Sequence, residues 1–248
     1  MSFKRLYQVS PLGCIGIFVM GGVFSAMLGM TSVWGTVKGM SVRDISAIVA
    51  AVYLGGLVAQ FPIGWLSDRM DRRLLILQLL VLGVLAIALQ LLLDPGIWGT
   101  LIVAGIAGGV ANPVYALLLA HTNDYLDADD MAAASAGLLF LNGLGAVGGP
   151  LIVGRMMSVI GPNGFWIYIL LLMAALAAYT AWRMTQRVAL TPEETGSFAV
   201  IAPAATTVAV EVALENAQDD PPPVEDQEDI APADYEVAPA EAGEEHPS

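Results

Sequence analysis

Six long apolar segments, separated by short polar breaks, constrain this chain more than any other feature of its sequence. They fall near residues 12–35, 43–66, 74–93, 97–120, 132–157 and 163–184. Each is close to the roughly 20 residues that a helix needs to cross a hydrocarbon core. Lipid tolerates only helices and closed barrels, and these runs lack the alternation of barrel strands. We therefore predict an all-α membrane protein with six transmembrane helices embedded in a lipid bilayer.

The composition supports a membrane solvent. The 248 residues are 56% hydrophobic and only 13% charged, with a mean hydropathy of +0.69, whereas soluble domains carry about 25% charged residues. The single cysteine, Cys14, excludes an internal disulfide. The apolar run after Lys4 and Arg5 is longer than the core of a secretory signal peptide, and we interpret it as the first span.

The acidic residues are concentrated at one end of the chain. Residues 188–248 contain fifteen acidic residues, eight prolines and no Lys or Arg, whereas residues 1–187 hold all ten bases against eight acids. A segment of this kind buries too little apolar surface to offset its chain entropy. We predict a membrane domain over 1–187 and a disordered acidic tail over 188–248. The acidic balance gives no basic face for nucleic acid, so no nucleic-acid partner is expected.

The basic residues predict the orientation of the helices. With the N-terminus inside, seven bases are cytoplasmic and three lie outside. The inner set is Lys4, Arg5, Arg69, Arg72, Arg73, Arg183 and Arg187, and the outer set is Lys38, Arg43 and Arg155. Under the positive-inside rule this asymmetry predicts that both termini, and so the acidic tail, are cytoplasmic.

The first three spans share a pattern with the last three. Gly21-Gly22-Val23 recurs as Gly108-Gly109-Val110, 87 positions later, while Gly55 and Pro62 recur as Gly143 and Pro150, at an offset of 88. A unit of three helices is odd, so two copies must lie inverted in the membrane, an arrangement common in transporters. Chance is the alternative, because Gly and Pro are frequent in membrane helices.

The segment Gly64 to Arg73 carries the strongest local motif, GWLSDRMDRR. It resembles the pattern G-x-L-S-D-R-x-G-R-R of the major facilitator superfamily (MFS), with Asp71 in place of the second glycine. Like the family's motif, it lies between the second and third helices of a six-helix half. The resemblance implies a conformational loop motif formed by Gly64, Asp68, Arg69, Arg72 and Arg73. We expect Gly64 to allow close helix approach, Asp68 to cap a helix, and the arginines to hold the loop at the anionic leaflet.

A second resemblance lies in the fifth span, at residues 145–154, GAVGGPLIVG. It is similar to the family's Gly-x-x-x-Gly-Pro element, found in the corresponding helix of the other half in many antiporters. Gly145 and Gly149 are small residues four apart that permit close packing, and Pro150 can bend the helix. An antiport signature and ordinary helix packing both remain open for this element.

The resemblance covers residues 1 to about 187 and implies the C-terminal six-helix half of a transporter in a bacterial inner membrane. In the family, the substrate cavity lies between two halves, so this chain supplies one wall. Transport of an unknown small molecule by alternating access then requires a partner half or a second copy of the chain. The alternative is a truncated, transport-inactive fragment that acts only as an interaction protein in the membrane.

By the same resemblance, the first, second, fourth and fifth helices line the cavity, and polar residues near their midpoints are candidates for substrate contact. These residues are Ser25, Tyr53, Asn112, Tyr115 and Asn142. A polar group at the membrane centre is costly and is therefore either functional or hydrogen-bonded to a neighbouring helix. Both interpretations stay open at each position.

No Asp, Glu, Lys or Arg lies in the middle of a span. The nearest titratable group is His121, with Asp124 close behind it, at the cytoplasmic end of the fourth span. These two residues could form a gate or a proton relay, or they could organise the adjoining loop.

Intramembrane enzymes and channels fit the sequence poorly. Rhomboid-type proteolysis needs an intramembrane serine in a Gly-x-Ser context paired with a membrane histidine, and no such pair is found within the spans. An aquaporin needs two Asn-Pro-Ala loops, whereas the chain has only Asn112-Pro113 followed by Val114. With two histidines and one cysteine, zinc chemistry lacks ligands. We expect no enzyme activity, no catalytic residues, no cofactor and no metal.

Overall fold

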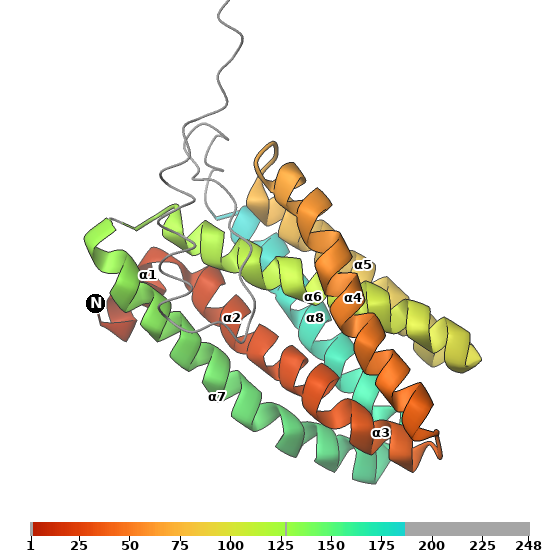
Figure 1. The fold of residues 1–248 in the computed structure, drawn as a ribbon. Coiled ribbons are helices and arrows are strands. Elements are labelled where there is room, and N and C mark those ends of the chain that lie inside the picture. The colour runs from red at the N-terminus through yellow and green to blue at the C-terminus, as the bar shows by residue number, and fades with distance from the viewer. Residues whose placement is uncertain (1, 127, 187–248) are drawn as a thin grey trace, which may run out of the picture.

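The computed structural model describes residues 2–126 and 128–186, and all regular structure in these two ranges is helical. Figure 1 shows the helices as one bundle with their long axes roughly aligned. Their bounds are α1 Phe3–Val9, α2 Pro11–Phe24, the π-helix η1 Ser25–Met30, α3 Thr31–Val37, α4 Val42–Ser67, α5 Arg72–Leu93, α6 Gly96–Asn123, α7 Ala128–Ile160 and α8 Gly164–Met184.

Six helical stretches are long and apolar enough to cross a membrane, which confirms the predicted all-α architecture. The first runs from Pro11 to Val37 through α2, η1 and α3 without a break. The other five begin and end within a few residues of the predicted spans. The predicted acidic tail, 188–248, lies outside the described residues together with Arg187, so its disorder remains a prediction.

Two elements were not predicted. The π-helix η1 interrupts the first span at Ser25, where the backbone widens to i→i+5 hydrogen bonding. The short helix α1 precedes the first span and packs against α7. Arg5 lies 2.7 Å from Asp130 of α7, and the ring of Phe3 lies 5.5 Å from that of Phe140.

Side-chain caps explain where several helices begin. The Ser10 hydroxyl accepts from the Gly13 N–H at the start of α2, and Pro11 occupies the first helical position, where no donor is needed. Asp71 caps α5 by accepting from the Arg73 N–H at 2.8 Å. This cap is the residue that departs from the family motif, and its φ of −55° makes no demand for glycine.

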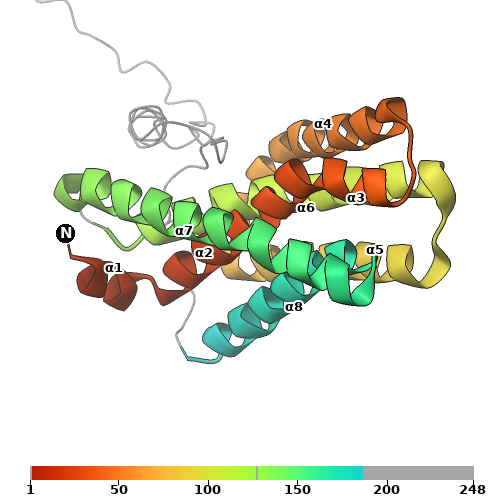
Figure 2. The same ribbon diagram turned by 90° about the horizontal axis from the view of Figure 1, so that it is seen from below.

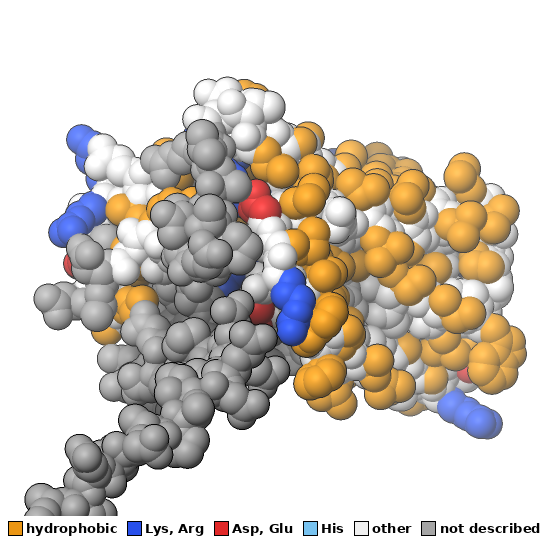
Figure 3. Space-filling model, turned by 90° about the horizontal axis from the view of Figure 1, so that it is seen from above, with side chains coloured by type: hydrophobic (Ala, Val, Ile, Leu, Met, Phe, Trp, Pro, Cys, Tyr) orange, Lys and Arg blue, Asp and Glu red, His pale blue; other side chains and the backbone are white. Residues whose placement is uncertain are grey.

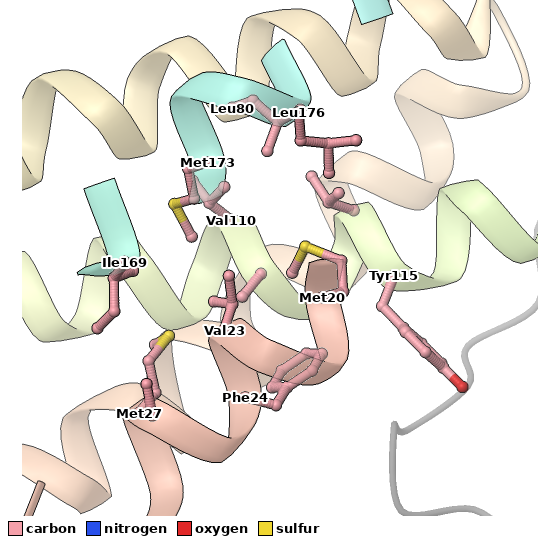
Figure 4. Close-up of a cluster of buried hydrophobic side chains, with 14 of the residues drawn as sticks. Met20, Val23, Phe24, Met27, Leu80, Val110, Tyr115, Ile169, Met173 and Leu176 are labelled. Carbon is pink, nitrogen blue, oxygen red and sulfur yellow. The ribbon is translucent and has the colours of Figure 1, made fainter. Parts of the chain in front are cut away.

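The two central helices, α2 and α6, carry most of the packing. The outer helices α4 and α7 lie at opposite edges of the bundle, α4 against α6 and α7 against α2 (Figure 1). On a third side, α5 and α8 pack against each other behind the central pair (Figure 2). Figure 4 shows how α2, α5, α6 and α8 meet in the core, with Met20, Val23, Leu80, Val110 and Met173 among the buried side chains.

Glycines let α7 approach α2 with almost no space between the backbones. A Cβ atom on Gly21 would overlap the carbonyl oxygen of Asn142, and one on Gly145 would overlap that of Phe18. Small residues at such contacts increase van der Waals packing, which drives helix association where lipid removes the hydrophobic effect.

The contact between α4 and α6 is built in the same way. A Cβ atom on Gly55 would overlap the carbonyl oxygen of Gly105, and one on Gly108 would overlap that of Val52. This is the most extensive helix pair in the bundle.

The two contacts use corresponding positions. Equivalent residues of α2 and α6 are 87 positions apart, as Phe18 and Gly105 or Gly21 and Gly108 are. Equivalent residues of α4 and α7 are 90 positions apart, as Val52 and Asn142 or Gly55 and Gly145 are. The first separation equals the sequence-derived offset, whereas the second exceeds the expected 88 by two residues. The shared contacts support our proposal that the bundle contains two copies of a three-helix unit.

Substitution of Gly55 tests the close contact. We expect Gly55→Ala to destabilise the bundle by about 1–3 kcal/mol, because the added methyl group pushes α4 away from α6. Gly143→Ala is the matched control, since a Cβ atom there meets no heavy atom within 4 Å and alanine favours a helix by up to about 1 kcal/mol. Thermal unfolding of the detergent-purified variants measures both effects. Equal melting temperatures for the two variants would contradict the close approach.

Candidate functional site

The motif loop joins α4 to α5 and begins in the last turn of α4. The buried Gly64 accepts a backbone hydrogen bond from the Asp68 N–H, which closes that turn. The Arg69 guanidinium donates to the Trp65 carbonyl at 3.0 Å and lies 4.0 Å over the Trp65 ring. Arg69 is exposed, and it fits the expected role of an arginine at the lipid surface.

A buried ion pair joins the motif to the end of α6. Arg72 Nη1 lies 2.6 Å from Asp124 Oδ1, and only 3% of each side chain is exposed. Arg72 Nε also donates to the Ser67 hydroxyl at 3.2 Å. Two charges removed from solvent remain charged only when paired and hydrogen-bonded. The pair therefore ties the ends of α4, α5 and α6 together.

Arg73 is also buried and lies beside Asp71. Its Nη2 atom is 3.2 Å from Asp71 Oδ2, and its side chain is 7% exposed. The expectation that the motif arginines hold the loop at the leaflet therefore fits Arg69 alone. Arg72 and Arg73 are instead buried, and the carboxylates of Asp124 and Asp71 balance their charges.

His121 lies in the last turn of α6, 8% exposed. Its ring meets that of Tyr125 edge-on, with centroids 5.2 Å apart. Next to it, the Thr122 hydroxyl donates to the Ser10 hydroxyl at 3.1 Å, which links α6 to the start of α2. Polar contacts thus join four spans at this end of the bundle.

Asn142 lies buried in the contact between α7 and α2. Its Oδ1 accepts no hydrogen bond from any described residue, and this atom lies next to Gly21. A buried carbonyl oxygen without a donor costs stability, so its presence calls for a reason other than folding.

Ser25 and Asn112 occupy corresponding places in the two glycine contacts, 87 positions apart. Ser25 lies against Gly149 and donates to the Gly22 carbonyl at 3.0 Å. Asn112 lies against Gly56 and donates to the Gly108 carbonyl at 3.1 Å. Both side chains are half-buried, and each of these bonds returns to the residue's own helix.

The two tyrosines lie apart from this group. Tyr53 is 59% exposed on the outer face of α4. Tyr115 is buried with its ring 6.0 Å from that of Phe24, edge to face, and Figure 4 shows its hydroxyl pointing away from the core cluster. The five predicted cavity residues therefore do not form one cluster.

The Gly-Pro element of α7 faces α2. Gly145 and Gly149 both lie in the contact with α2, against Phe18 and Ser25. Pro150 lies inside α7, which continues through it to Ile160. This geometry is that of close helix packing and leaves an antiport role as a proposal.

Comparison with known proteins identifies the family. A profile of the Major Facilitator Superfamily matches residues 12–218, which include all six spans. The chain belongs to this family. It is therefore a multi-pass membrane protein, as the resemblance of the loop motif implied.

The relatives are longer than this MFS chain. It is 27% identical over 184 residues to the uncharacterised MFS-type transporter YfkF of Bacillus subtilis, covering 71% of this chain and 45% of that protein. It is also 27% identical over 158 residues to an uncharacterised MFS-type transporter of Yersinia pestis, covering 64% and 40%. The chain spans less than half the length of these curated relatives.

Solved structures share the fold. A POT family peptide transporter, crystallised in an auto-inhibited form, superimposes with a TM-score of 0.60 at 16% identity, over 73% of this chain and 38% of the transporter. At that identity the likeness concerns the fold alone.

Several residues of the site were missed by sequence reasoning. Ser67 stood within the quoted motif, but its role depends on the position of Arg72. Ser10 and Thr122 are 112 positions apart, and no local pattern connects them. Among the described residues, no three His, Cys, Asp or Glu side chains gather closely enough to hold a metal ion.

Neutralising Asp124 tests the buried ion pair. We expect Asp124→Asn to lower the unfolding free energy by about 3–5 kcal/mol, because Arg72 is left buried without its counter-charge. Asp94→Asn, in the exposed pair with Lys38 at 3.2 Å, should cost no more than about 1 kcal/mol. Thermal unfolding in detergent gives both values. In the double variant Arg72→Gln/Asp124→Asn, the unfolding free energy should fall by less than the sum of its decreases in the two single variants. A decrease equal to that sum would argue against a direct interaction between the two residues.

Proposed function

We propose that this chain is the C-terminal six-helix half of a transporter that moves a small molecule across a bacterial inner membrane by alternating access. The observation that carries the proposal is the family match across all six spans, in a chain that covers 40–45% of its relatives. The chain supplies one wall of the cavity and works with a partner half, either a second polypeptide or another copy of itself. It acts as a carrier and not as an enzyme.

The outer helices offer surfaces for such a partner. In the most apolar stretch of each helix, only 22% of the residues of α4 and 28% of those of α7 are buried, whereas the share for α6 is 67%. Each helix carries an exposed apolar stripe with helical spacing. The stripes are Leu54, Leu57, Val58, Phe61 and Trp65 on α4, and Phe140, Leu144, Val147 and Leu151 on α7.

The polar contacts at the motif end support movement of the half as a rigid body. In alternating access, one bundle rocks against the other around a fixed site. The Arg72–Asp124 pair and the Ser10–Thr122 bond hold four spans together at one end, so force applied by the partner moves them as one unit. We assign the motif loop and His121 to this locking role.

Asn142, Ser25 and Asn112 are the residues that we assign to the substrate, with the exposed Tyr53 and the buried Tyr115 as further candidates. Asn142 has the strongest case because its buried Oδ1 accepts no hydrogen bond from the described residues. A ligand donor that reaches this oxygen gains the full benefit of a buried hydrogen bond.

Replacement of Asn142 separates a transport role from a structural one. We expect Asn142→Leu to leave the melting temperature unchanged or higher, since it removes an unsatisfied oxygen, and to lower substrate uptake by about tenfold or more. Uptake of a panel of radiolabelled sugars, amino acids and organic ions into vesicles containing the active assembly measures the second effect. Thr180→Val serves as a control on α8, because the Thr180 hydroxyl bonds within its own helix. Unchanged uptake by Asn142→Leu removes this residue from the site.

An interaction protein that does not transport a solute is the second candidate, favoured by the exposed apolar stripes on α4 and α7. Light scattering of the chain purified in mild detergent distinguishes the two candidates. An assembly of two six-helix halves that moves a solute agrees with the proposal, whereas a monomer without transport agrees with the inactive fragment.

We further propose that both termini lie in the cytoplasm. In a Cys14→Ser background, Val42→Cys should react with a membrane-impermeant maleimide in intact cells, because Val42 is 81% exposed at the end of the bundle assigned to the outside. Arg69→Cys, at the opposite end, should react only after the cells are permeabilised. Labelling of Arg69→Cys alone in intact cells would reverse the assignment.

A further inference from the structure

A small recess lies at the α1 end of the bundle, where α2 and α5 begin and α6 and α8 end. It offers about 20 Å³ to a water-sized group and is open on one side. Leu12 forms part of its apolar wall, and Ser10, Arg73, His121, Tyr125 and Arg183 provide polar groups. None of the predicted cavity residues contributes to this lining.

The recess is electropositive. Two arginines line it from different helices, Arg73 in the first turn of α5 and Arg183 in the last turn of α8. The N-terminus of α2 also faces it, and its peptide dipoles favour an anion. Arg73 is paired with Asp71, but Arg183 pairs with no carboxylate among residues 2–126 and 128–186. Among the described residues, two arginines therefore stand against one paired carboxylate, so an anion meets a net positive charge.

The surroundings of Arg183 place the recess at the edge of the membrane. The Arg183 guanidinium lies 6.0 Å from the Trp182 ring, and Trp182 packs against Tyr179 with centroids 5.7 Å apart. Trp182 is 55% exposed, and Trp and Tyr concentrate at the headgroup level of bilayers. In Figure 3, Lys and Arg side chains appear mainly toward this end, and hydrophobic side chains cover most of the rest of the face.

We propose that this recess binds the phosphate of an anionic phospholipid headgroup. Basic pockets between transmembrane helices bind such headgroups, and an arginine fork matches phosphate oxygens. The space of about 20 Å³ admits a group the size of one water, such as a phosphate oxygen, and not a transported solute. The proposal requires only insertion into a bilayer, so it stands or falls separately from the proposed transport.

Native mass spectrometry of the full chain in mild detergent tests the site, with phosphatidylglycerol as the anionic lipid and phosphatidylcholine as the zwitterionic control. We expect one retained phosphatidylglycerol per chain and little phosphatidylcholine. Arg183→Gln should weaken retention about tenfold, the value of one charge-assisted hydrogen bond. Lys4→Gln is the matched control, because it removes one exposed positive charge at the same end outside the recess, and it should retain the lipid as the unaltered chain does.

Three results would overturn the proposal. Equal retention of the two lipids would show that the site does not select an anionic headgroup. An equal loss of retained phosphatidylglycerol in Arg183→Gln and Lys4→Gln would show that only the general surface charge of the protein matters. Displacement of phosphatidylglycerol by an equal concentration of inorganic phosphate shows a site for the free ion and not for lipid. If Arg183→Gln does not fold, the unaltered chain is crosslinked with a photoreactive phosphatidylglycerol, and the crosslinked residues locate the bound lipid. Crosslinks at residues 10–12, 121–125 and 183 are expected, and crosslinks only along the α4 and α7 stripes contradict the site.

Discussion

The close approach of helix backbones through glycine is the interaction on which the rest of this structure depends. In lipid, apolar side chains gain little by leaving their solvent, so helices associate through contact area and polar bonds. Gly21 and Gly145 bring α2 and α7 together, and Gly55 and Gly108 do the same for α4 and α6. These two contacts position Ser25, Asn112 and Asn142.

The polar groups at the ends of the bundle differ from those in the middle of the spans. The ends hold ion pairs, such as that of Arg72 with Asp124, and hydroxyls that link helices, as Ser10 and Thr122 do. In the middle of the spans the polar groups are neutral, and Ser25 and Asn112 bond back to their own helices. The Asn142 Oδ1 stays unsatisfied within the described residues, as do three buried nitrogen atoms, those of the Trp34 and Trp166 indoles and the Asn123 amide. These two features, the polar contacts at one end and the unsatisfied acceptor at the centre, are what the proposed role as one wall of a carrier requires.

The spans could be predicted from the sequence because length and hydropathy are local properties, and the family followed from ten consecutive residues of the motif loop. Contacts between distant residues could not be predicted. Nothing near Arg72 marks Asp124, 52 positions away, as its partner. Gly143 and Gly145 look alike in the sequence, but only Gly145 faces α2, since two positions on a helix differ by about 200°. The π-helix at Ser25 also left no local signal, because no proline interrupts the first span after Pro11.

The two ends of the bundle are chemically different, as the separations of the two helix pairs, 87 and 90, show. If these separations are continued to the other end, Asp124 corresponds to Val37 and Arg72 to Pro162. Neither Val37 nor Pro162 can carry a charge, so the opposite end has no equivalent of the buried ion pair. A protein whose halves were truly symmetric would open to either side at equal cost. In the proposed transporter the two ends are closed by different contacts, with the buried Arg72–Asp124 pair at the motif end.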